Sequence, residues 1–82
     1  MINLLIMLFS SFEVVAIGYA NEKSQAYAVE VAKYDATTDM QIACKSKGGD
    51  TLVAIGFGDP VCEKEDNRFH CRVAAQAWCV RG

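Results

Sequence analysis

The sequence lacks the features that mark several common classes of protein. Among its 82 residues, 8 Lys and Arg stand against 10 Asp and Glu, the net charge is −2, and no basic cluster occurs. Such a chain has no positive field to attract nucleic acid or anionic lipid. Its four cysteines include no closely spaced C-x2-C pair, which a structural zinc site normally uses. We therefore expect no nucleic-acid partner, no metal and no cofactor.

Catalytic motifs are missing as well. The one histidine, His70, stands beside Cys71, but neighbouring side chains of a strand point to opposite faces of the sheet. The imidazole would then be unable to take the thiol proton, as a cysteine nucleophile requires. The glycine-containing stretches fit neither a dinucleotide fingerprint nor a phosphate-binding loop. We expect no catalytic residues and a protein that is not an enzyme.

The start of the chain has the composition of a signal peptide. Residues 1–20 contain no Lys or Arg and are almost unbroken in their apolar character, and small residues precede the polar segment 21–25. We expect cleavage between Ala20 and Asn21, which leaves a polar leader at 21–25 and one domain at 26–82. The apolar run is short for a membrane span and contains an acidic residue, so no stable span is expected after processing.

All four cysteines lie in the 62 residues that such processing would leave. A chain of this length buries only roughly 60% of its unfolded surface, so its core alone is marginal. An even number of cysteines in a short exported chain is typical of a disulfide framework. We therefore expect a periplasmic or secreted protein stapled by two disulfides.

Three segments have the composition of β-strands. Residues 26–34 and 68–80 alternate in polarity, and residues 51–57 are rich in β-branched side chains. Pro60 has no backbone donor, so the middle strand belongs at an edge and the last strand at the centre. The expected fold is α+β: a small β-α-β-β domain, with a three-stranded sheet in the order 1-3-2 and one short helix.

The helix is expected over residues 39–47. Thr38 followed by Gln41 fits a capping box at its start, and Gly48 with Gly49 supplies a left-handed stop. Its buried side is expected to carry Ala36, Met40, Ala43 and Cys44.

The stretch between Cys62 and Cys71 predicts a β-hairpin. Asp66 and Asn67 tolerate the positive φ that a two-residue turn requires. That turn places Cys62 opposite Cys71 at a non-hydrogen-bonded position, where α-carbons lie roughly 4.5 Å apart. This separation is within the range that a disulfide accepts.

In the same register, Cys79 lies opposite Ala54 and is free to meet Cys44 on the helix. The favoured disulfides are therefore Cys62–Cys71 and Cys44–Cys79, each contributing roughly 2–4 kcal/mol. The alternative interlocks the four cysteines as Cys44–Cys71 and Cys62–Cys79.

One face of the sheet is expected to carry an apolar patch. Both disulfides are expected on the face that bears small residues, and Cys44 draws the helix over that face. The opposite face would then carry Val53, Ile55, Phe57, Trp78 and Val80. A bare patch of this size indicates a partner, which could be another protein, an envelope component or a second copy of the chain. The alternative is a bulge at Gly56 or Gly58. Such a bulge reverses the alternation of side chains between the two faces of the sheet, and it would turn some of these side chains inward.

From Met40 onward the sequence resembles the periplasmic domain of the outer-membrane stress-sensing lipoprotein of the Rcs phosphorelay. The shared features are "MQI" opening a helix, a following hairpin, and four cysteines with the same separation of Cys62 and Cys71. The resemblance covers about half of the chain. Cys44 lies inside the helix rather than before it, and the lipid-accepting cysteine is absent. The resemblance implies a non-enzymatic envelope sensor and favours the interlocked disulfides.

Taken together, the residues predict a small exported, disulfide-stabilised binding or envelope protein without enzymatic activity. The alternative is a secreted effector or inhibitor-like peptide that acts on another cell. A cysteine-dependent redox or hydrolytic enzyme is a remote third reading.

Overall fold

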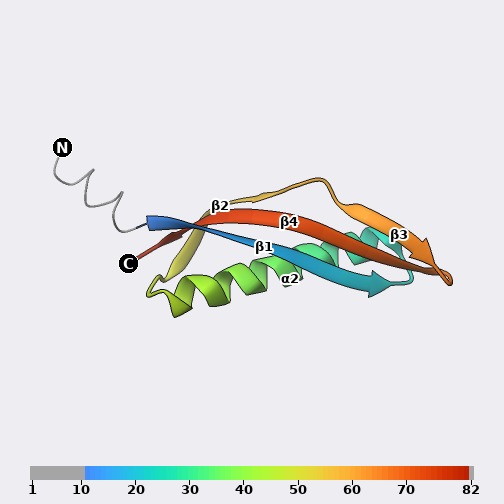
Figure 1. Cartoon of the computed structure of the whole chain (residues 1–82), viewed down its shortest axis with the longest axis horizontal. Coiled ribbons are helices and arrows are strands. Elements are labelled where there is room, and N and C mark those ends of the chain that lie inside the picture. The colour runs from blue at the N-terminus through green and yellow to red at the C-terminus, as the bar shows by residue number, and fades with distance from the viewer. Residues whose placement is uncertain (1–10, 82) are drawn as a thin grey trace.

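A long antiparallel sheet with one helix across one face makes up the fold in the computed structural model, which describes residues 11–81 (Figure 1). In chain order the elements are β1 (Ser11–Glu22), α2 (Gln25–Ser46), β2 (Thr51–Phe57), β3 (Val61–Glu65) and β4 (Arg68–Val80).

Strand β4 is the centre of the sheet. β1 pairs along its whole length, from Ser11 opposite Val80 to Glu22 opposite Phe69. On the other edge, β2 pairs with the C-terminal part of β4 and β3 with its N-terminal part. The α+β class and the central place of the last strand are confirmed, but the described sheet has four strands rather than three.

The predicted strand at 26–34 is wrong, and so is a helix confined to 39–47. One continuous helix runs over Gln25–Ser46. The alternation at 26–34 arises because Ala28 and Ala32, one helical turn apart, are both fully buried on the side of α2 that faces the sheet. Alanine is the strongest helix former, so helical propensity prevails over the apparent period of two.

The helix begins earlier than the predicted capping box and ends where it was expected. Ser24 is the N-cap, and its hydroxyl accepts a hydrogen bond from the Tyr27 N–H at 3.3 Å; Thr38 lies in the helix interior. At the other end Lys47 is the C-cap, and Gly48 adopts a left-handed conformation with a φ of 88°. Glycine takes this conformation without strain, which explains why the stop could be predicted.

Strand β1 occupies the segment that the sequence assigns to the signal peptide and leader. The expected cut between Ala20 and Asn21 falls inside this 12-residue strand and would remove the buried residues Val14 and Gly18. A chain cut at that position cannot form this sheet. Residues 1–10 of the predicted signal peptide lie outside the described residues.

Small side chains let α2 lie very close to β1. A methyl group at Gly18 would overlap the carbonyl oxygen of Ala32 and lie 2.6 Å from the backbone nitrogen of Ala36. The buried side of α2 is a stripe spaced every four residues: Ala28, Ala32, Ala36, Met40 and Cys44. With mostly alanine at the interface, the core is thin and little apolar area is buried per residue.

Two disulfides fasten this thin core. Cys44–Cys79 joins the end of α2 to β4, and Cys62–Cys71 joins β3 to β4, with Cα–Cα distances of 5.5 and 4.1 Å. These are the pairs that the residues favoured, and the interlocked pairing implied by the resemblance is wrong. No free cysteine occurs among residues 11–81.

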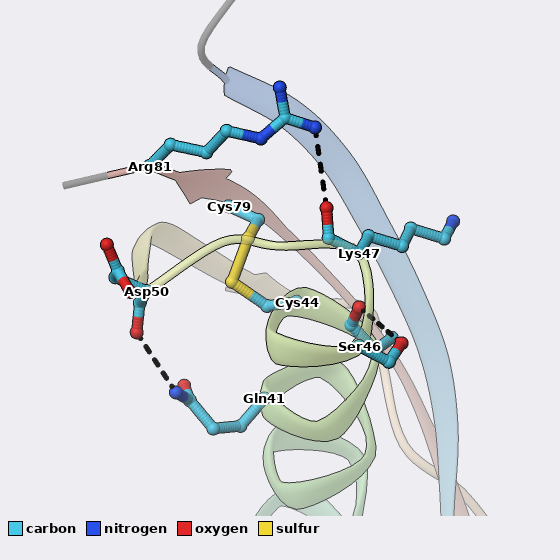
Figure 2. The surroundings of a disulfide bond; sticks show 8 residues. Gln41, Cys44, Ser46, Lys47, Asp50, Cys79 and Arg81 are labelled. Atoms are coloured by element: carbon cyan, nitrogen blue, oxygen red, sulfur yellow. Dashed lines mark hydrogen bonds between the residues drawn. A yellow bond between two sulfur atoms is a disulfide. The ribbon is translucent and has the colours of Figure 1, made fainter.

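Hydrogen bonds close the loop around the Cys44–Cys79 bridge (Figure 2). The Gln41 side-chain amide donates to the carbonyl oxygen of Asp50 at 3.3 Å, and the Arg81 guanidinium donates to that of Lys47 at 3.4 Å. These contacts tie Asp50 at one end of the α2–β2 turn to α2, and Lys47 at the other end to Arg81, the residue that follows β4.

The predicted hairpin is confirmed, but its register does not continue into β2. Asp66 and Asn67 have φ values of 52° and 64°, and Cys62 faces Cys71. Further along, two one-residue shifts place Leu52, rather than Ala54, opposite Cys79.

One of these shifts is a β-bulge in β2. Val53 faces Trp78 and Gly56 faces Gln76, so β2 carries one extra residue between the two pairs. Ala54 in the bulge has a φ of 54°. The bulge thus lies at Ala54 and Ile55, just before Gly56, rather than at Gly56 or Gly58 as predicted, and a non-glycine residue takes its left-handed conformation.

A first prediction concerns the close approach at Gly18. Gly18→Ala should lower the free energy of unfolding by about 1–3 kcal/mol, because the added methyl forces α2 away from the sheet. Gly56→Ala is the matched control: a Cβ there meets nothing within 4 Å, and we expect a change within about 0.5 kcal/mol. Urea unfolding followed by circular dichroism measures both, and equal effects of the two variants would contradict the packing described.

A second prediction ranks the two disulfides. Cys44–Cys79 spans 35 residues and Cys62–Cys71 spans 9, so loop-closure entropy predicts losses of about 4 and about 2.5 kcal/mol respectively when each pair is replaced by alanine. Both Cys44 and Cys79 are also fully buried in the core. Denaturant unfolding of the two double variants tests the order, and the reverse order would show that the helix is held mainly by other contacts.

Candidate functional site

The candidate site is the face of the sheet turned away from α2, which we call the open face. Side chains alternate between the two faces along β1 and β4, because successive residues of a strand point to opposite sides. Buried and exposed residues alternate in the same way along both strands. The open face carries Val15, Ile17, Tyr19, Val53, Ala74, Gln76 and Trp78.

A shallow apolar groove crosses the middle of the open face. Val15 and Ile17 of β1 form one side, and the backbone of Gly56 and Gly58 forms the other. The floor is low because Ala74 has only a methyl side chain. Val15 is 67% exposed, so large aliphatic surface remains in water here. Contiguous exposed apolar surface of this kind is a common feature of interaction sites, which makes the open face the candidate site.

Only some residues of the predicted apolar patch lie together on the open face. Val53 and Trp78 face each other across β2 and β4 on the open face, and Trp78 is 47% exposed. Val80, half-buried, ends β4 opposite Thr51.

The bulge removes two residues from the predicted patch. Phe57 faces Ala75, a buried residue on the α2 side, and the Lys33 ammonium of α2 lies 5.5 Å from the centre of the Phe57 ring. Phe57 therefore belongs to the α2 side of the sheet, while Ile55 lies in the bulge itself. The physical reason is that one extra residue inverts the alternation beyond it.

A polar hollow lies next to the groove on the same face. Its lining includes Tyr19, Asn21, Glu63, His70 and Arg72. Asn21, His70 and Glu63 stand in one row across β1, β4 and β3, while Tyr19 is directly opposite Arg72.

Arg68 orders one wall of this hollow. Its guanidinium donates to the side-chain and backbone oxygens of Asn21, each at 2.9 Å. Within residues 11–81 no ion pair joins Glu63 to His70 or Arg72. The donors of His70 and Arg72 thus remain available to bind a carboxylate or another anionic group on a ligand.

The arrangement contains no cysteine–histidine pair. His70 is exposed on the open face, whereas Cys71 is buried on the α2 side and bonded to Cys62. In the described part of the chain, no three His, Cys, Asp or Glu side chains come together in a group that could hold a metal ion. No helix between residues 11 and 81 has both the length and the apolar character needed to cross a membrane.

The contribution of β1 to this site differs from the sequence-based prediction. Val15, Ile17 and Tyr19 were assigned to the signal peptide, yet they form one edge of the open face. Their spacing does indicate a strand, because these large β-forming residues stand at every second position and alternate with the small residues Ala16 and Gly18.

Comparisons with known protein families, curated proteins and solved structures find no match for this chain. The resemblance to the Rcs lipoprotein domain therefore stays a prediction.

A third prediction concerns the apolar groove. The double variant Val15→Thr and Ile17→Thr should bind an apolar fluorescent dye more weakly than the unaltered protein, since it removes the most exposed aliphatic groups of the groove. The free energy of unfolding should change by no more than about 0.5 kcal/mol, because both side chains are exposed and threonine is a good strand former. Tyr27→Gln with Tyr34→Gln on the outer side of α2 is the control, and equal loss of dye binding in both variants would contradict the assignment.

Proposed function

We propose that this protein is a small non-enzymatic binding domain of an oxidising compartment outside the cytosol, in the periplasm or the medium, and that the open face docks another macromolecule. The observation that carries the proposal is the open face itself. It keeps Val15, Ile17, Tyr19 and Trp78 exposed in a domain whose buried core consists mainly of alanine and cysteine.

The disulfides support the compartment. All four cysteines are paired, and disulfides persist in secreted and periplasmic proteins but are rare in the reducing cytosol. Because the core is thin, the protein would lose much of its stability in a reducing environment.

The shape and chemistry of the open face favour a macromolecule over a small metabolite. Small-molecule sites are usually deep and enclose most of their ligand, whereas this groove is open along the surface of the sheet and lies beside the polar hollow. Protein interfaces typically combine a centre rich in aromatic and aliphatic side chains with a polar rim. Here Val15 and Ile17 supply the aliphatic centre, Trp78 lies toward one end of the open face, and His70 and Arg72 lie toward the other.

The resemblance to the Rcs lipoprotein domain would make the partner a component of the cell envelope. That domain type implies sensing rather than catalysis, and the open face offers docking chemistry for such a role. The disulfide pairing departs from what the resemblance implies, so the role of an envelope sensor rests on the open face alone.

A fourth prediction tests docking in intact cells. A photoreactive amino acid in place of Ile17 or Trp78 should form covalent adducts with one envelope or extracellular protein upon irradiation. The same amino acid in place of Tyr34 is the matched control, because Tyr34 is 76% exposed on α2, outside the open face. Adducts with a second copy of this chain do not count toward the prediction.

Fractionation of the same cells, with thiols alkylated before lysis, checks the compartment. We expect the protein outside the cytosol with no alkylated cysteine. Cytosolic protein with free thiols, or adducts formed as readily from the Tyr34 position, would contradict the proposed function.

A further inference from the structure

Charges of opposite sign mark the two ends of the apolar groove on the open face. At one end Glu13 of β1 faces Trp78 of β4, and at the other end Tyr19 of β1 faces Arg72 of β4. Glu13 and Arg72 are both exposed, and in the described part of the chain neither of them forms a salt bridge. The groove therefore has a negative end and a positive end.

The rows of residues between these two ends carry no charge. Val15 faces Gln76, which in turn faces Gly56 on β2. In the next row Ile17 faces Ala74. A partner that lies along the groove thus meets apolar surface in the middle and one charge at each end.

The charges beyond Arg72 compensate one another. His70 faces Glu63, and Arg68 faces Glu65, across β4 and β3. Arg72 has uncharged neighbours on both sides, so it supplies the positive charge that no acidic residue faces.

The separation of the two charged ends fits the repeat of an α-helix. From Glu13 to Tyr19, which faces Arg72, β1 advances six residues or about 20 Å. A helix covers this distance in about 14 residues, because each residue rises 1.5 Å. About 14 residues make nearly four complete turns, so two side chains this far apart lie on the same side of a helix.

The width of the groove fits a helix as well. Val15 and Ile17 stand on one side, and the floor at Ala74 and Gly56 is low. Three neighbouring strands span about 10 Å, which is close to the diameter of a helix with its side chains. The other face of the sheet already accepts a helix in this orientation, since α2 lies along the strands there (Figure 1).

We propose that the partner of the open face presents an amphipathic helix that lies along the groove, with an acidic side chain over Arg72 and a basic side chain over Glu13. Between these two, apolar side chains at three- and four-residue spacing fill the groove, as in other helix-in-groove complexes. The charges select the partner, because a helix with the wrong sign at either end meets like charge there. This inference rests on the proposed function, since it names the chemistry of the macromolecule that docks on the open face.

A fifth prediction tests the helix with two synthetic peptides, each about five helical turns long and free of tryptophan. Both carry leucine at helical spacing. The first has one Glu and one Lys about 14 residues apart, and the second has Lys at both positions. Trp78 is the single tryptophan of the chain and is 47% exposed on the open face, so its fluorescence reports binding to the purified oxidised protein.

The unaltered protein should bind the Glu–Lys peptide roughly fivefold more tightly than the Lys–Lys peptide at low salt. Arg72→Glu makes both ends of the groove acidic and should invert this preference. Lys45→Glu is the matched control, because it changes the net charge equally at an exposed position on α2. It should leave the preference unchanged.

Several results would overturn the proposal. These are no binding of either peptide, equal binding of both by the unaltered protein, or a shift for Lys45→Glu as large as that for Arg72→Glu. Trp78 fluorescence that changes with protein concentration alone would assign the groove to a second copy of the chain instead. Should Arg72→Glu lose its circular dichroism spectrum, Arg72→Gln decides the outcome, since it should bind the two peptides equally.

The failure of this inference differs from the failure of the proposed function. Photo-adducts from Ile17 in intact cells, together with equal binding of the two peptides, would retain docking on the open face and reject the helix.

Discussion

The close approach of α2 to β1 at Gly18 is the contact on which the rest of the structure depends. Because Gly18 has no side chain, the helix backbone at Ala32 and Ala36 lies directly against the strand. Such a tight interface is built from small side chains and buries little apolar area. Stability must therefore come from cross-links. The Cys44–Cys79 bridge attaches the C-terminal end of α2, just after the buried Met40, to β4.

The same contact determines which surfaces remain for function. One helix covers one face of the sheet, and the chain between residues 11 and 81 supplies no second layer for the other. Val15 and Ile17 alternate with the residues that face α2, so the strand that makes the core also makes the open face. Among residues 11–81 no strand pairs with the outer edge of β1, where Asp35 of α2 accepts a hydrogen bond from the Tyr19 N–H.

Local chemistry allowed part of this structure to be predicted. The turn at Asp66 and Asn67, the helix stop at Gly48 and the pairing of Cys62 with Cys71 each follow from a few neighbouring residues and fixed geometry. The central place of β4 followed from Pro60, which excludes the neighbouring segment from the centre. The disulfide between Cys44 and Cys79 then followed from the face on which each lies.

The remaining errors share a physical cause, which is that small residues carry little information about burial. The alternation at 26–34 was interpreted as a strand because alanines at helical spacing also occur at every second position. Residues 11–20 are mostly apolar, as in a signal peptide, with Glu13 as their one charged residue, and their contacts with α2 and β4 distinguish them as a strand. The bulge at Ala54 depends on a left-handed alanine, which no sequence rule favours.

The central claim is that residues 11–22 are part of the folded protein as β1. The intact mass of the protein recovered from its own compartment, without reduction, tests this claim most directly. We predict a mass that includes residues 11–22 and the loss of four hydrogens for two disulfides. A mass that begins at Asn21, for a protein that is still folded, would contradict the account.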